Sequence, residues 1–205
     1  MKISVAVITY NQQDTIAQTL DSILCQQGDF ELEVVVGEDC GTDNTWVICQ
    51  DYAERYPEQV VLLENTHNLG ITANFARVMK ACTGELVSVI AGDDYYYSDK
   101  ALDIQSKYLL AHPEYGVMCA NGYRYYVKRD EMIPGIPPLN PIEDGNVKPV
   151  FFGEKYFGGV AKEISLEQIT SCYDGIENEC PDISGELIYK KHCNAVYSAM
   201  VWKQK

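Results

Sequence analysis

Apolar and polar residues alternate in blocks along the first half of the chain. Short, nearly continuous apolar runs are typical of buried strands, and between them apolar residues recur at helical spacing. The runs predict strands at residues 3–8, 32–36, 60–63, 86–90 and 115–120. The helical spacing predicts helices at residues 14–24, 42–56, 72–82 and 101–111. Strands that alternate with helices indicate a mainly parallel sheet with right-handed crossovers and helices on both faces.

Small polar residues stand where two of these helices begin. Asn11 or Asp14 could cap the first helix, and Thr42 or Asp43 could cap the second, because their side chains accept hydrogen bonds from free N–H groups. These caps fix the expected boundaries of the helices.

The pattern changes after Gly122. The segment 133–141 contains four prolines and predicts a loop or linker rather than regular structure. Residues 150–152 predict a strand or loop, and residues 162–170 a short helix. We therefore expect an α/β, Rossmann-like core at residues 1–122 and an irregular C-terminal region at residues 123–205.

The composition excludes several classes of protein. A net charge of −14 and a pI of about 4.5 argue against nucleic-acid binding, which needs a basic surface. No apolar stretch approaches the roughly 20 residues of a transmembrane helix, and the first apolar run ends at Thr9 without a cleavage site. The eight cysteines form no Cys-x-x-Cys pair, so reduced thiols and a cytoplasmic location are expected. A peripheral position at the inner face of the membrane is compatible with this.

Polar loops follow each of the first four predicted strands. Because the carboxyl ends of parallel strands meet at one edge of a sheet, these loops form a candidate binding site. The fourth loop carries Asp93 and Asp94. An isolated pair of this kind is most often an ordinary solvated turn, but two adjacent carboxylates also suit a divalent cation that is shared with substrate phosphates.

Four segments together resemble family 2 glycosyltransferases of the GT-A fold: residues 4–11, 34–45, 68–70 and 92–95. The resemblance covers about residues 1–122. It implies a nucleotide-sugar donor, with UDP as the leading candidate, and a divalent Mn²⁺ or Mg²⁺ ion. It also implies transfer of the sugar to an acceptor hydroxyl with inversion.

The same resemblance assigns roles to individual residues. Asp94 would be the direct metal ligand, with Asp93 near the ribose or the metal-bound water. Asp39 would accept a hydrogen bond from the uracil ring N–H, or from an equivalent donor edge of another base, because an ionised carboxylate only accepts. The remaining nucleotide-binding positions are Thr9, Tyr10, Asn11, Glu38, Asn68, Gly70 and Asn74.

The general base is the least defined part of the predicted site. The family places an acidic base in the second half, where Asp174 and Asp182 are candidates, but surface acids of this kind are most often solvated loop residues. The acceptor would be a glycan or lipid-linked glycan in polysaccharide biosynthesis. An alternative is a catalytically impaired nucleotide-sugar-binding protein of the same fold. A nucleotidyltransferase is disfavoured, because residues 9–13 contain neither glycine nor a basic side chain.

Overall fold

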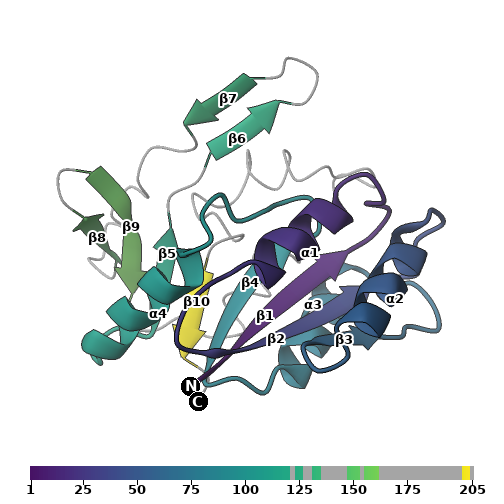
Figure 1. The fold of residues 1–205 in the computed structure, drawn as a ribbon, viewed down its shortest axis with the longest axis horizontal. Coiled ribbons are helices and arrows are strands. Elements are labelled where there is room, and N and C mark those ends of the chain that lie inside the picture. The colour runs from purple at the N-terminus through teal and green to yellow at the C-terminus, as the bar shows by residue number, and fades with distance from the viewer. Residues whose placement is uncertain (121–122, 127–130, 135–146, 153–154, 162–199, 204–205) are drawn as a thin grey trace.

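One large mixed sheet organises the molecule (Figure 1). A computed structural model of the chain describes residues 1–120, 123–126, 131–134, 147–152, 155–161 and 200–203. Eight strands form the sheet in the order β3-β2-β1-β4-β10-β5-β9-β8. Their bounds are β1 Lys2–Thr9, β2 Glu31–Glu38, β3 Val60–Leu63, β4 Leu86–Ala91, β5 Val117–Ala120, β8 Val147–Phe152, β9 Lys155–Ala161 and β10 Met200–Lys203. A separate hairpin pairs β6 (Tyr123–Tyr126) with β7 (Glu131–Pro134).

The strands β3, β2, β1 and β4 form the parallel half of the sheet. This confirms the predicted α/β, Rossmann-like architecture. The other half was not predicted: β10 runs antiparallel to both of its neighbours, β4 and β5, and β9 and β8 extend the sheet by further antiparallel pairs. The sheet therefore continues past residue 122 and uses strands from the C-terminal region.

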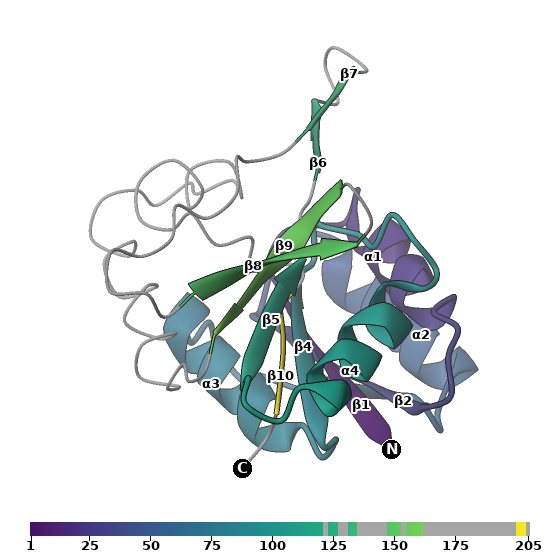
Figure 2. The same cartoon turned by 90° about the vertical axis from the view of Figure 1, so that its left-hand side faces the viewer.

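Four helices in the described residues cover the sheet, and Figure 2 shows α3 on one side and the other three on the opposite side. They are α1 Ile16–Leu24, α2 Thr45–Arg55, α3 Ile71–Ala81 and α4 Ala101–Ala111. Successive side chains of a strand point to opposite faces, so Val5 and Val7 pack with α1, α2 and α4, whereas Ala6 and Ile8 pack with α3. In the described part of the chain, no helix is long and apolar enough to cross a membrane.

The predicted start of α1 was wrong. The helix begins at Ile16, and its N-cap residue Thr15 makes no side-chain cap hydrogen bond. Asn11 instead accepts a hydrogen bond from the backbone N–H of Thr42, in another loop. For α2, the helix begins at Thr45, and the Asp43 carboxylate accepts hydrogen bonds from the Thr45 N–H and hydroxyl. Asp43, which precedes the helix, thus provides a hydrogen-bond acceptor for the first N–H group of α2.

The proline-rich segment also required a correction. Residues 133 and 134 belong to β7 rather than to a loop, and Pro134 pairs with Tyr123 at the end of a two-stranded ribbon. A proline is tolerated there because an edge strand leaves N–H positions unpaired. Residues 150–152 lie in β8, and the short helix expected at 162–170 lies outside the described residues.

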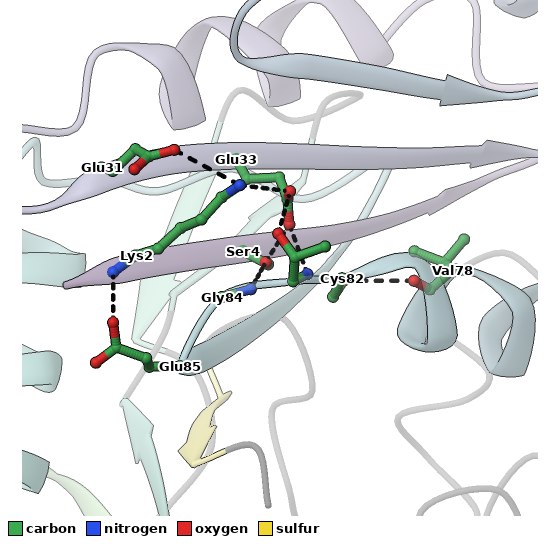
Figure 3. A network of polar contacts seen from close by, with 9 residues as sticks. Lys2, Ser4, Glu31, Glu33, Val78, Cys82, Gly84 and Glu85 are labelled. Atoms are coloured by element: carbon green, nitrogen blue, oxygen red, sulfur yellow. Dashed lines mark hydrogen bonds and ion pairs between the residues drawn. The ribbon is translucent and has the colours of Figure 1, made fainter.

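A buried carboxylate holds the edge of the sheet where β1, β2 and β4 begin (Figure 3). Glu33 on β2 is only 7% exposed and accepts hydrogen bonds from the Ser4 hydroxyl and from the N–H and hydroxyl of Thr83. The Lys2 ammonium lies 2.9 Å from Glu33 Oε1 and also pairs with the exposed Glu31. Ser4 Oγ in turn accepts the Gly84 N–H at 2.7 Å, so three strands are joined at this edge.

Candidate active site

The carboxyl ends of β1, β2 and β4 lie side by side, at the edge opposite to Glu33. Thr9 at the end of β1 is in register with Glu38 of β2, and Ile8 is in register with Ala91 of β4. In the sheet, β2 and β3 lie on one side of β1, and β4 lies on its other side. Open α/β sheets bind ligands at such a switch point, because the loops on its two sides diverge and leave a crevice.

The loop after β1 forms the centre of this region. Thr9 is buried, and its hydroxyl donates to Gln12 Oε1 at 2.8 Å. Tyr10 is 48% exposed, so its ring is available to a ligand. Asn11 has a left-handed backbone (φ 51°), and its side-chain oxygen accepts the Thr42 N–H at 2.7 Å. This bond ties the loop after β1 to the loop after β2.

The loop after β2 turns sharply around the Glu38 carboxylate. Glu38 is buried and accepts hydrogen bonds from the backbone N–H groups of Cys40 (3.0 Å) and Gly41 (2.7 Å). Cys40 adopts φ 56°, a conformation that is uncommon for a residue with a Cβ. Burial raises the pKa of the Glu38 carboxyl, and these backbone hydrogen bonds oppose that effect.

Asp39 connects the loop after β2 to the loop after β3. Its carboxylate accepts hydrogen bonds from the backbone N–H of Leu69 (2.8 Å) and of Gly70 (2.9 Å), and from Asn65 Nδ2 (2.9 Å). The Asp39 carbonyl accepts a further bond from Asn68 Nδ2 at 3.0 Å. The predicted residues Asp39, Asn68 and Gly70 are therefore direct neighbours.

Asn74 is brought to the same region by α3. The side chain is buried, and its Nδ2 donates to the Gly37 carbonyl at 2.8 Å. This bond fixes the backbone of β2 at the residue before Glu38.

The acidic loop is packed against the end of β1. The Gly92 N–H donates to the Ile8 carbonyl at 2.9 Å, and a Cβ at Gly92 would lie 2.6 Å from Thr9 Oγ1. Only glycine allows this close approach. The following residues, Asp93 and Asp94, are partly exposed at the switch point.

Two hydroxyls, one on α1 and one on its N-cap residue Thr15, hold the backbone of the acidic loop. Thr19 Oγ1 lies 2.9 Å from the Gly92 carbonyl and 2.7 Å from the Asp94 carbonyl, and Thr15 Oγ1 donates to the Gly92 carbonyl at 3.0 Å. Thr19 is only 1% exposed. The position of the acidic pair is thus set by a helix as well as by the sheet.

A divalent cation fits this arrangement only together with a ligand. In the ranges that the structure describes, no group of three or more His, Cys, Asp or Glu side chains could hold a metal. Mg²⁺-type ions are commonly bound by one or two carboxylates plus substrate phosphates and water. Asp93 and Asp94 supply hard oxygen donors of that kind.

The sequence analysis missed several residues that position the predicted ones: Gln12, Thr15, Thr19, Asn65 and Arg77. Asn65 carried a usable signal, because it follows the third predicted strand on the same edge of the sheet. The hydroxyls of Thr15 and Thr19 carried no such signal, since helical spacing does not show which residue of a helix faces a loop. The candidate bases Asp174 and Asp182 lie outside the described residues.

Comparison with known proteins identifies the family. The model of "Glycosyl transferase family 2" matches residues 4–159. The chain belongs to this family. The match covers the parallel half of the sheet except the first two residues of β1, and it includes both sides of the switch point, which confirms the resemblance of residues 4–11, 34–45, 68–70 and 92–95.

Curated relatives of this family 2 glycosyltransferase are longer proteins. An uncharacterized protein of Mycobacterium bovis is 36% identical over 137 residues, which cover 67% of this chain and 39% of the relative. The poly(ribitol-phosphate) β-N-acetylglucosaminyltransferase TarS of Staphylococcus aureus is 38% identical over 107 residues, which cover 50% of this chain and 18% of TarS. The chain thus spans less than half the length of these relatives.

Solved structures show the same fold. The mannosyltransferase PcManGT from Pyrobaculum calidifontis, in complex with GDP-Man and Mn²⁺, superposes with a TM-score of 0.53 at 28% identity. That match covers 59% of this chain and 36% of PcManGT. TarS residues 1–349 superpose with a TM-score of 0.56 at 22% identity, covering 86% of this chain and 48% of that structure. Both are consistent with the GT-A fold predicted for the chain.

Proposed function

We propose that the chain transfers a sugar from a nucleotide-sugar donor, UDP-linked in our assignment, to an acceptor hydroxyl with inversion. The observation that carries the proposal is the Asp93–Asp94 pair beside the end of β1, across from the Asp39 turn. Residues 1–122 would bind the donor and residues 123–205 would face the acceptor, a glycan or lipid-linked glycan. The name of TarS, an N-acetylglucosaminyltransferase, supports a hexosyl-type donor.

Asp94, with Asp93, would hold the cation. A bound Mn²⁺ or Mg²⁺ neutralises negative charge on a diphosphate leaving group, which would otherwise depart poorly. The complex of PcManGT with GDP-Man and Mn²⁺ supports this assignment. Among the described residues, the free thiols of Cys25, Cys40 and Cys49 fit a cytoplasmic protein.

The protein must also deprotonate the acceptor hydroxyl. A carboxylate base removes that proton as the acceptor oxygen attacks, as in inverting glycosidases. Asp174 and Asp182 remain our candidates for this role, and each is tested by an Asp→Asn variant in a transfer assay.

The metal assignment is tested by calorimetric titration of UDP with and without MnCl₂. In the unaltered chain we expect Mn²⁺ to tighten UDP binding by about tenfold or more, which corresponds to about 1.4 kcal/mol. Asp94→Asn should lose this gain while its unfolding temperature stays close to that of the unaltered chain. Asp51→Asn is the matched control, because Asp51 is an exposed carboxylate on α2 that forms an ion pair with Arg55.

Two outcomes would contradict parts of the proposal. An undiminished Mn²⁺ effect in Asp94→Asn would overturn the metal assignment. Metal-dependent UDP binding without turnover of any UDP-sugar, with any glycan acceptor, would support the alternative of a nucleotide-sugar-binding protein that no longer catalyses transfer.

A further inference from the structure

Every hydrogen-bonding group of the Asn65 side chain has a partner in the protein. Asn65 lies two residues after the end of β3, and its Nδ2 donates to the Glu38 carbonyl at 3.1 Å and to Asp39 Oδ1 at 2.9 Å. Its oxygen accepts a hydrogen bond from Arg77 Nη1. Both amide hydrogens and the amide oxygen therefore have partners.

Arg77 fixes which way the Asn65 amide faces. Arg77 lies on α3, and its second nitrogen, Nη2, donates to the Glu64 carbonyl at 2.6 Å. A guanidinium only donates, so the Asn65 oxygen must face Arg77. The Asn65 nitrogen must then face Asp39. A flipped amide would place two donors against each other and leave Asp39 Oδ1 without this partner.

The Asp39 carboxylate consequently has little acceptor capacity left. A carboxylate offers about four lone-pair positions. Oδ1 accepts from Leu69 N and Asn65 Nδ2, and Oδ2 accepts from Gly70 N. By this count one position remains, on Oδ2.

We propose that Asn65, held by Arg77, is a specificity-determining residue that restricts the site to a nucleobase with a single N–H donor. Uracil presents one ring N–H on its pairing edge, which matches one free acceptor position. Guanine presents two adjacent donors, a ring N–H and an amino group, and needs both carboxylate oxygens. A buried donor left without a partner strongly disfavours binding. This inference rests on the proposed function and names its donor as a uridine nucleotide.

The test measures the dissociation constants of UDP and GDP, each with MnCl₂, by calorimetry. We expect the unaltered chain to prefer UDP by about tenfold or more. Asn65→Ala frees Oδ1, and the preference should fall to about threefold or less because GDP gains relative to UDP. Arg77→Met should shift the preference in the same direction, and Arg77→Lys, which retains a donor, should restore part of it. Arg55→Met on α2 removes a similar side chain that stacks on Tyr52 and should leave the ratio unchanged.

The outcomes separate the two proposals. If UDP binds but Asn65→Ala and Arg77→Met keep the original UDP/GDP ratio, Asn65 does not set specificity and only the inference fails. An equal loss of affinity for both nucleotides would likewise overturn it, since that is the effect of a packing residue alone. A preference of the unaltered chain for GDP would overturn the inference while leaving a transferase function intact. Binding of neither nucleotide would overturn both.

Discussion

Two buried carboxylates on β2 have opposite electrostatic surroundings. Burial alone would raise the pKa of Glu33, but hydrogen bonds from Lys2, Ser4 and Thr83 outweigh it and lower the pKa to about 2. Burial raises the pKa of Glu38, and the neighbouring charges of Asp39 and Asp43 add to that effect. The difference arises because Glu33 is surrounded by hydrogen-bond donors, the Lys2 ammonium first among them, whereas Glu38 has two acidic neighbours.

Glu33 should therefore stabilise the fold in a pH-dependent way. Its folded-state pKa of about 2 lies below the ordinary glutamate value of 4.5, so its contribution is present above pH 4.5 and is lost as the pH falls from about 4.5 to 2. We expect Glu33→Gln to lower the free energy of unfolding by about 2 kcal/mol at pH 7. The difference from the unaltered chain should shrink by more than half at pH 3. Urea unfolding at several pH values measures this.

Glu31→Gln provides the matched control for that experiment. Glu31 also pairs with Lys2, but at 3.5 Å and with an exposed side chain, so its removal should change stability by less than about 0.5 kcal/mol. Equal effects of the two variants, or a Glu33→Gln effect that does not depend on pH, would contradict the role assigned to the Glu33 network.

At the scale of single elements, α1 links the hydrophobic core to the acidic loop. Ile16, Leu20 and Ile23 bury one face of the helix, while the hydroxyls of Thr15 and Thr19 reach the carbonyls of Gly92 and Asp94. Because α1 is packed in the core, its hydrogen bonds hold the backbone of the loop that carries Asp93 and Asp94.

Thr19→Val removes this link with little change in volume. We expect the variant to fold with a loss of about 1 kcal/mol and to show a several-fold smaller effect of Mn²⁺ on UDP affinity, because the Asp94 backbone is no longer held. Calorimetry with and without Mn²⁺ measures this effect. Thr19→Ser keeps the hydroxyl and should restore it. A Thr19→Val chain with an undiminished Mn²⁺ effect would show that α1 does not position the acidic pair.

The elements that could be predicted from sequence are those with a clear local pattern of apolar residues. The α4 prediction, 101–111, coincides with the observed helix, and Phe75, Val78 and Met79 are buried on α3. The predicted cap of α1 failed because Asn11 bonds to Thr42, in a loop that only the folded sheet brings near. The same reason applies to the candidate site, where motifs predicted Asp39 and Asp94 but not Asn65 or Thr19, which contact them in the fold.

At the scale of the whole molecule, β10 joins the two halves of the sheet. Met200 pairs with Val89 of β4 and with Cys119 of β5, and Trp202 pairs with Val87 and Val117. No pattern in the sequence predicted this strand, since four residues carry little periodicity and their pairing partners are remote.

A chain that ends before Met200 tests the importance of this strand. Without β10, the main-chain groups of β4 and β5 that it pairs lose their partners in the middle of the sheet. We expect the unfolding temperature to fall by about 10 °C or more, as measured by circular dichroism. A chain that ends at Lys203 keeps β10 whole and should unfold like the full chain. Equal unfolding temperatures for the two shortened chains would contradict a central role for β10.

The central place of β10 also affects how the chain reaches its native state. Strands β1, β2 and β3 pair with one another in chain order, each through one crossover connection. Strand β10 instead pairs with β4 and β5, which are remote from it in sequence, and such pairings form slowly. While residues 200–203 are still unpaired, β4 and β5 present open strand edges that a second copy of the chain can occupy. We therefore expect the insertion of these four residues to limit the rate of folding and, until it occurs, to leave the chain exposed to aggregation.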